Sequence, residues 1–474
     1  MKNSRYSLLF LLLIGFTSGA CKKQLNVFPT TSQVDGNVIT DQQSAQVVLN
    51  GIYYRFADVS EDFVTGMTSI FWSSINEELP SELAGSITGY SLIDSAILSP
   101  GDQYASSIWS YCYAVVNAAN GFIKNVAAVN NFPASIKHQM LAEAKFLRAF
   151  GNSELLLYFG QYNNPSSKYG IIIRDTFVTA DNINLPRSDV AAAYTAILSD
   201  LDSAINGLPA LNTNIANANA SDAKLLKARM LMNRGAAGDY AQVVSLTNDI
   251  ISNGPFVIED SLKDIFLTKG FTSTEVMLGI QPFPNESYKF LIYQYECDYN
   301  ATDSFVNLLA NDGRNQWVYQ YAFNASQGQA VDQLTKYYSG DPVNLVQTPL
   351  SANCYVFRLS EAYLLEAEAI TLSTGDLGSA KTLLTTVMGH AGAGPQEMAA
   401  VANAATPAAL QLEIVKENMR NFAYENGVDW FALRRLPFAT LQSLNPNFKD
   451  PHQLIFPIPT AELDQNNVIQ NPGY

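Results

Sequence analysis

The stretch SIKHQMLAEAKFLRAFGNSELLLYF, residues 135–159, carries the clearest fold signal in the chain. Met140, Ala144 and Leu147 recur at intervals of three or four residues, and Phe150 lies on an adjoining apolar stripe. This spacing places apolar side chains along one face of an α-helix, because the helix repeats about every 3.6 residues. The stretch therefore predicts a long helix packed into a core.

The same helical pattern continues downstream. Residues 188–206 predict a second helix with Ser188 as its N-cap, ended by Gly207 and Pro209. Ser221 is the expected N-cap of a third helix. Successive amphipathic helices joined by short turns favour an all-helical array over a sheet protein.

A later segment repeats this style. Residues 364–371 predict a helix rich in Ala and Leu, Gly375 and Asp376 predict a turn, and a further helix contains Ala380 and Leu384. Helix, turn and helix in this order are typical of tetratricopeptide-like hairpins, although the usual ~34-residue consensus is absent. The predicted fold class is mostly α, a tetratricopeptide-like α-α superhelix.

Two stretches, residues 59–103 and 260–353, break the helical pattern. The second is rich in aromatics, with 13 among the 60 residues from 281–340, against 11% aromatic residues in the whole chain. These aromatics lie among Asn, Gln, Asp and Ser. Long irregular inserts in a regular scaffold often carry function, so we expect the ligand there.

Composition excludes several classes of protein. The 474 residues are 47% hydrophobic and 15% charged, which suits a large packed core. The net charge of −15 would repel nucleic-acid phosphates, so we expect no nucleic-acid partner. After Cys21 only Cys112, Cys297 and Cys354 follow, which indicates neither a disulfide framework nor a CxxC metal site.

Residues 1–20 read as a secretory signal peptide. Lys2 and Arg5 give a basic start, an apolar run too short to span a bilayer follows, and small residues precede Cys21. A Cys directly after such a segment predicts lipid modification at Cys21. The alternative is an ordinary signal peptide with Cys21 nearby by chance.

Catalytic motifs are missing from the sequence. The three histidines, His138, His390 and His452, form no HExxH or similar spacing, and no P-loop or GxGxxG opens a helix. We expect no enzyme activity, no cofactor and no metal site. A calcium site at 298–303 is an open alternative, although that stretch lacks the EF-hand glycine and distal Glu.

Sugar binding needs flat aromatic faces beside planar polar groups in a preformed cleft. Two clusters in the irregular stretches offer both. The predicted ligand-binding residues are Trp72 and Asn76 in the first cluster, and Asp312, Arg314, Asn315, Trp317 and Tyr319 in the second. The alternative is that these aromatics fill an irregular core, as we expect for Trp109 and Trp430.

Several motifs together resemble the SusD/RagB family. They are CKKQLNVFPT at 21–30, EAKFLRAF at 143–150, RLSE at 358–361, and the closing LIFPIPTAELDQNNVIQNPGY at 454–474. They occur in the family's order from Cys21 to Tyr474. One segment departs from the family pattern: Asn418 follows Glu417, Asn421 replaces a second Glu, and Asn426 separates Glu425 from Gly427. This departure puts the salt bridges near Glu417 and Glu425 in doubt.

The resemblance implies one SusD-like nutrient-binding domain, residues 21–474, on a right-handed helical scaffold. It implies a lipoprotein anchored in the outer membrane and facing the exterior. Such a protein would capture oligosaccharide or polysaccharide for a SusC-like TonB-dependent β-barrel transporter. A tetratricopeptide-like peptide-binding scaffold and a surface glycosidase with two facing carboxylates are the alternatives.

Overall fold

The computed structural model describes residues 38–474, except for 58, 62–67, 71, 90–91, 282–288, 290–298, 326 and 339–345. The predicted signal peptide, Cys21 and Asp298 lie outside the described residues. Within the described part, no helix is both long enough and apolar enough to cross a membrane.

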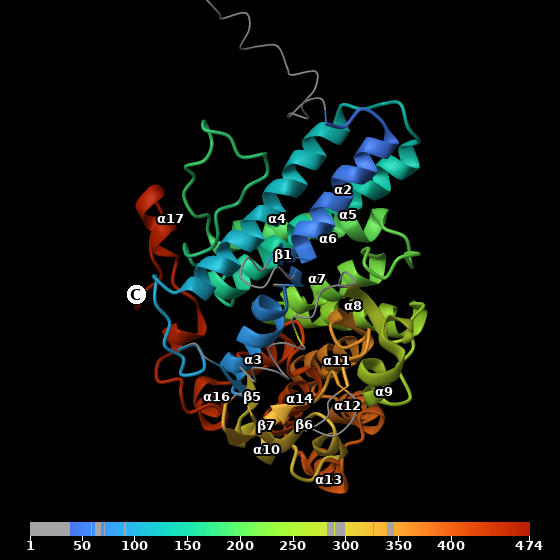
Figure 1. Ribbon diagram of the computed structural model, residues 1–474, viewed down its shortest axis with the longest axis vertical. Helices are drawn as coiled ribbons and strands as arrows, with labels where there is room; N and C mark the ends of the chain where they lie inside the picture. Colours follow the sequence, from blue (N-terminus) through green and yellow to red (C-terminus); the bar gives the residue numbers. More distant parts are fainter. Residues whose placement is uncertain are drawn as a thin grey trace, which may run out of the picture.

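Four long helices form one end of the molecule (Figure 1). They are α2 (Gln42–Ala57), α4 (Gln103–Ala127), α5 (Ala134–Phe159) and α6 (Val190–Gly207). Helix α4 packs against α2 and α5, and α6 packs on the other side of α5. The long helix predicted from residue 135 begins one residue earlier and is almost entirely buried in its second half, because it lies between neighbours.

Both expected N-caps are displaced. Helix α6 is capped by Asp189, whose carboxylate accepts a hydrogen bond from the Ala192 amide at 2.6 Å. Helix α7 (Ala220–Arg234) is capped by Asn219, which forms a reciprocal capping box with Asp222. The predictions of Ser188 and Ser221 were wrong because Asp and Asn cap at least as well and lie closer to the helix start.

The helical array continues to the far end of the molecule. Its further elements are α8 (Asp239–Asn253), α11 (Leu359–Ser373), α12 (Leu377–Ala391), α13 (Pro395–Asn403), α14 (Pro407–Phe422) and α15 (Val428–Leu433). Helix α7 packs on α8, α8 on α11, and α11 on α12 and α14. The mostly helical, tetratricopeptide-like prediction is confirmed.

Short elements fill the remaining chain. The strands are β1 (Val59–Glu61), β2 (Thr68–Ile70), β3 (Ile87–Thr88), β4 (Val276–Ile280), β5 (Asn300–Ala301), β6 (Tyr319–Asn324), β7 (Gln329–Leu334) and β8 (Cys354–Arg358). The short helices and turns are η1 (Ser74–Glu78), α3 (Leu79–Ala84), α9 (Leu262–Asp264), η2 (Ile265–Lys269), η3 (Gly270–Thr272), α10 (Asp303–Leu308), η5 (Gly313–Gln316), α16 (Phe438–Leu444), η6 (Pro451–Leu454) and α17 (Thr460–Gln465). One sheet has the order β3-β5-β7-β6, and β4 pairs antiparallel with β8. Strands β6 and β7 lie at the end of the molecule opposite α2 (Figure 1).

The irregular region from 260 to 353 has its own apolar core. Phe266 packs edge-on against Tyr337 and Tyr355, with ring centroids 5.5 Å and 5.1 Å apart. This cluster is separate from the main core of the helices. An insert of short strands therefore stays ordered because aromatic side chains give it enough apolar area to bury.

Motif residues tie distant parts of the scaffold together. Arg187 donates to the carbonyl oxygens of Phe159 and Gly170 and to the side chain of Asn471 in the closing motif. Arg148 forms a bidentate pair with Asp200, both bonds 2.7 Å long. Planar guanidinium groups suit such paired acceptors, so Arg148 and Asn471 of the quoted motifs, together with Arg187, hold distant segments in register.

Candidate functional site

The hairpin β6–β7 positions the candidate site. Its strands pair from Tyr319 with Leu334 to Asn324 with Gln329. At the turn, the Asn324 side chain accepts a hydrogen bond from the Gln327 amide at 2.9 Å. Gly328 adopts a φ of +68°, a conformation that other residues reach only with strain.

A groove of about 260 Å³ opens at the base of this hairpin. It is lined by Lys263, Leu267, Thr268, Gln316, Trp317, Gln320, Thr335 and Tyr338. Its walls thus combine two aromatic rings with amide, hydroxyl and ammonium groups. This is the combination that a sugar ring needs, since its C–H face is apolar and its rim is polar.

Two aromatic side chains define the floor of the groove. Trp317 is 8% exposed, and its ring lies 6.1 Å from that of Phe266 at 31°. The Trp317 carbonyl accepts a hydrogen bond from the Thr335 hydroxyl at 2.7 Å, which fixes the backbone beside the ring. The buried hydroxyl of Tyr338 has no hydrogen-bond partner among the described residues. Burial also raises its pKa well above the usual value, so the group stays a neutral donor.

Two further aromatics project from the hairpin. Tyr321 is 72% exposed and Phe323 is 65% exposed, whereas Ala322 between them is buried. Neighbouring strand residues face opposite sides, so Tyr321 and Phe323 lie on the face away from Gln320 and the groove. The exposed rings of Tyr321 and Phe323 form a second aromatic surface on the face of the hairpin opposite the groove.

The first predicted cluster lies in the core. Trp72 is 0% exposed and packs edge-on against Phe56 at 6.4 Å between ring centroids. Asn76 is also buried, and its amide group donates to the Trp72 carbonyl at 3.4 Å. The Trp72 ring has no exposed surface, whereas part of the Trp317 ring stays open beside a groove, so the site proposed below does not include Trp72 and Asn76.

The second predicted cluster divides in two. Asp312 and Arg314 are buried, and Arg314 donates to Asp312 and, through two bonds of 2.7 and 2.9 Å, to Glu417 of α14. Asn315 is half-buried and donates to the Ala310 carbonyl at 3.2 Å. Of the seven predicted residues, Trp317 alone is among those that line the groove. Tyr319 begins strand β6 on the same face as Tyr321 and Phe323. The buried ion network of Asp312, Arg314 and Glu417 instead joins the insert to helix α14 of the scaffold.

A second buried ion network holds the other strand of the hairpin. Lys336, just after β7, donates to the Glu425 carboxylate at 2.5 Å and to the Ala423 carbonyl at 2.7 Å. Arg358 donates to Glu425 and to Glu275, each at 2.6 Å. The divergent segment 417–427 therefore keeps its buried ion pairs despite the Asn substitutions.

The pKa shifts follow from this burial. Desolvation lowers the pKa of Lys336 to about 8, against the opposing attraction of Glu425. Burial alone would raise the pKa of Glu425, but the charges of Arg358 and Lys336 hold it below its usual value. Because these buried charges are paired, their burial lowers the stability of the fold little. Removing one partner would leave the other charge buried and uncompensated.

The groove offers no arrangement for hydrolysis. A glycosidase needs two carboxylates facing each other across roughly 5 to 9.5 Å. None of the residues that line the groove in the described structure is acidic. Likewise, no three His, Cys, Asp or Glu side chains of the described part gather as a metal site. The groove can hold a polar ring, and its lining supplies no acid–base pair.

Comparison with known proteins identifies the family. Residues 37–228 match the model described as starch-binding, associating with the outer membrane, and residues 288–474 match that of the SusD family. No curated protein sequence matches the chain.

Solved structures share the fold. SusD superfamily proteins from Bacteroides thetaiotaomicron and Parabacteroides distasonis each show 19% identity and a TM-score of 0.73. A laminarin-binding SusD-like protein shows 19% identity and a TM-score of 0.68. Each likeness covers 92% of this chain and all of the other. The two matching models span most of the sequence, and the chain belongs to the SusD/RagB family.

Proposed function

We propose that the protein is a non-catalytic binder that captures oligosaccharide in the groove beneath the β6–β7 hairpin. The observation that carries the proposal is the lining of one groove by the rings of Trp317 and Tyr338 together with amide, hydroxyl and ammonium groups. The Trp317 ring gives a stacking surface, and the polar groups give donors and acceptors for sugar hydroxyls. The laminarin-binding neighbour of the same fold adds support for a glycan as the ligand.

The polar lining would set the orientation of the sugar. Gln316 and Gln320 supply amide groups and Lys263 supplies an ammonium group, each able to bind ring hydroxyls. Tyr321 and Phe323 add an exposed aromatic surface on the other face of the hairpin, which a chain long enough to pass around the hairpin would also contact. This arrangement favours an oligosaccharide over a single sugar.

The bound glycan would then pass to a transporter. A binder without a membrane-spanning segment cannot move its ligand across a bilayer by itself. We propose a SusC-like TonB-dependent β-barrel as the partner, docked against the helical scaffold. The residues from Cys21 onward would tether the protein to the outer face of the outer membrane, after removal of residues 1–20. Recovery of a large β-barrel with the tagged protein from mild detergent tests the partner, and repeated recovery without a barrel would overturn it.

The anchor has its own test. Cys21→Ser should release the protein from membranes, because no acyl chain can then be attached. Membrane fractionation with mass analysis of the N-terminus gives the result. Equal membrane association of the variant and the wild type would contradict the anchor.

The binding claim is tested by incubating purified protein with soluble starch, laminarin and other glycans. We expect binding by calorimetry with glycan chain lengths unchanged after incubation. Gln320→Ala removes an amide group from the groove lining and should weaken binding several-fold, since a hydrogen bond contributes about 1 kcal/mol. Shortened glycans would exclude the non-catalytic proposal, and an unchanged affinity of Gln320→Ala would exclude the groove.

A further inference from the structure

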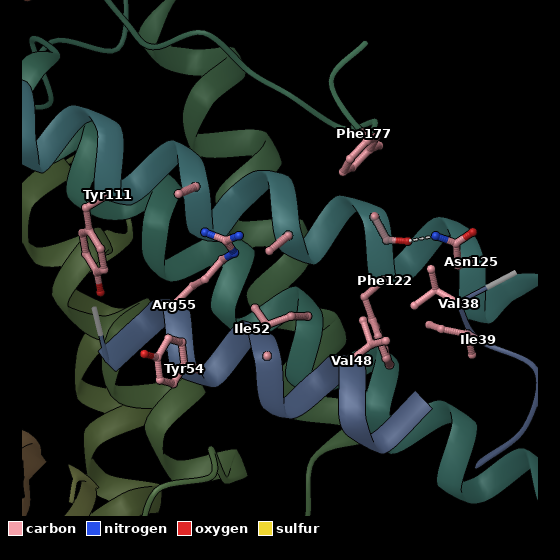
Figure 2. Close-up of a pocket in the computed structure, with 14 residues that line it drawn as sticks. Val38, Ile39, Val48, Ile52, Tyr54, Arg55, Tyr111, Phe122, Asn125 and Phe177 are labelled. Carbon is pink, nitrogen blue, oxygen red and sulfur yellow. Dashed lines mark hydrogen bonds between the residues drawn. The ribbon is translucent and has the colours of Figure 1, made fainter. Parts of the chain in front are cut away.

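A larger groove lies at the other end of the molecule, between α2 and α4 (Figures 1 and 2). Its volume is about 600 Å³, within the usual range of ligand sites. Its apolar lining includes Val48 and Ile52 of α2, Phe122 of α4, Phe177, and Val38 and Ile39 just before α2. Apolar hollows of this size on a folded protein commonly mark binding sites.

Small residues keep the groove open. Its lining includes Ala114, Ala118 and Gly121 of α4 and Gly51 of α2. A Cβ atom built on Gly51 would meet nothing within 4 Å. The α4 residues that line the groove run from Tyr111 to Asn125, about 20 Å along a helix. The hollow is therefore long and narrow, a shape that fits an extended chain.

The far wall is held in place by hydrogen bonds. The Val178 amide donates to the Asn117 side chain at 2.8 Å, and Asn120 donates to the carbonyl of Thr176 at 3.2 Å. Phe177 lies between these anchors, and a Cβ on Gly121 would approach its ring to 3.0 Å. The loop rests directly on α4, so the groove is preformed.

Among the described residues that line the groove, Arg55 alone is charged. Helix α2 carries Arg55 alone and α4 carries Lys124 alone, although the chain has 43 acidic and 28 basic residues. Arg55 lines the groove and reaches from α2 toward α4 (Figure 2). None of the described carboxylates pairs with it. An anionic head group would be attracted to Arg55. The net negative charge of the protein would repel it from most of the remaining surface.

We propose that this groove binds a fatty acid, with the alkyl chain between α2 and α4 and the carboxylate on Arg55. The inference is independent of the glycan groove, which lies at the opposite end of the molecule (Figure 1). Arg suits the role because its guanidinium binds a carboxylate through two parallel hydrogen bonds. The protein would thus carry a lipid-binding site at the end of the molecule opposite its sugar-binding site.

The test uses the full chain and laurate below its micelle concentration. Gly51→Phe should fill the groove and weaken laurate binding by about tenfold or more. Gly389→Phe is the matched control, because Gly389 lies on α12 and its Cβ would also meet nothing within 4 Å. Replacing Gly in a helix should not unfold either variant, and thermal melting checks this.

A second comparison tests the head group. Wild-type protein should prefer laurate to the neutral dodecanol, and Arg55→Gln should lose that preference while still binding dodecanol. Failure of laurate to bind would overturn the proposal, as would equal binding by Gly51→Phe and wild type. Self-association of the wild type that Gly51→Phe abolishes would assign the groove to a second copy and overturn it too.

Discussion

The side chains singled out in the helical scaffold and in the aromatic insert have different roles. In the scaffold, Arg148 and Arg187 bind partners that join neighbouring helices to one another. In the insert, Trp317 and Tyr338 leave part of their surface facing a groove. The comparison teaches that motif residues such as Arg148 assemble the scaffold, whereas the residues of the proposed glycan groove lie outside those motifs.

The largest expected effect concerns the junction between the two regions. Arg358→Ala should lower the free energy of unfolding by about 3–5 kcal/mol, since it leaves Glu275 without its cation in a buried site. Denaturation in urea measures it. The control is Lys416→Ala, which removes a partly exposed pair with Glu413 and should cost at most about 1 kcal/mol. Similar losses in both variants would contradict the role given to the buried network.

The scaffold also predicts a pH dependence of stability. Burial raises the pKa of Glu154 on α5 to about 7, despite the nearby charges of Arg229 and Arg434. Between the unfolded pKa of about 4.3 and about 7, the unfolded state loses this proton first, so Glu154 lowers stability as pH rises. Glu154→Gln should remove this contribution, which reaches roughly 3 kcal/mol.

Melting curves of Glu154→Gln and wild type at pH 5 and pH 8 measure the difference. We expect the stability of the variant, relative to that of the wild type, to be higher at pH 8 than at pH 5. A stability difference that is the same at both pH values would show that Glu154 does not titrate as proposed.

The smallest expected effect on stability lies on the hairpin. Tyr321→Ala and Phe323→Ala together should change the free energy of unfolding by no more than about 0.5 kcal/mol per residue, because both rings are exposed. Glycan affinity should fall for long chains and change little for short ones. A large loss of stability would mean that these rings pack in the insert's core.

How much the sequence could predict differs between the two regions. Apolar periodicity placed the helix at 135–159 to within one residue of Ala134–Phe159, because helical spacing and burial reinforce each other there. The N-caps were harder, since Asn219 competes with Ser221 and only the reciprocal bond to Asp222 decides between them. In the two irregular stretches, some aromatic side chains pack in a core and others lie on the surface. Nothing in the pattern separates Trp72, fully buried, from Tyr321, largely exposed.

The most direct test of the glycan-binding account compares two tryptophans by calorimetry with the glycan that binds wild-type protein best. Trp317→Ala should weaken binding by about fivefold or more, because loss of an aromatic platform costs on the order of 1 kcal/mol. Trp72→Phe, which keeps an apolar ring in the core, should bind as wild type does. Normal binding by folded Trp317→Ala, or a selective loss in Trp72→Phe, would contradict the assignment of the glycan site to the groove beneath β6 and β7.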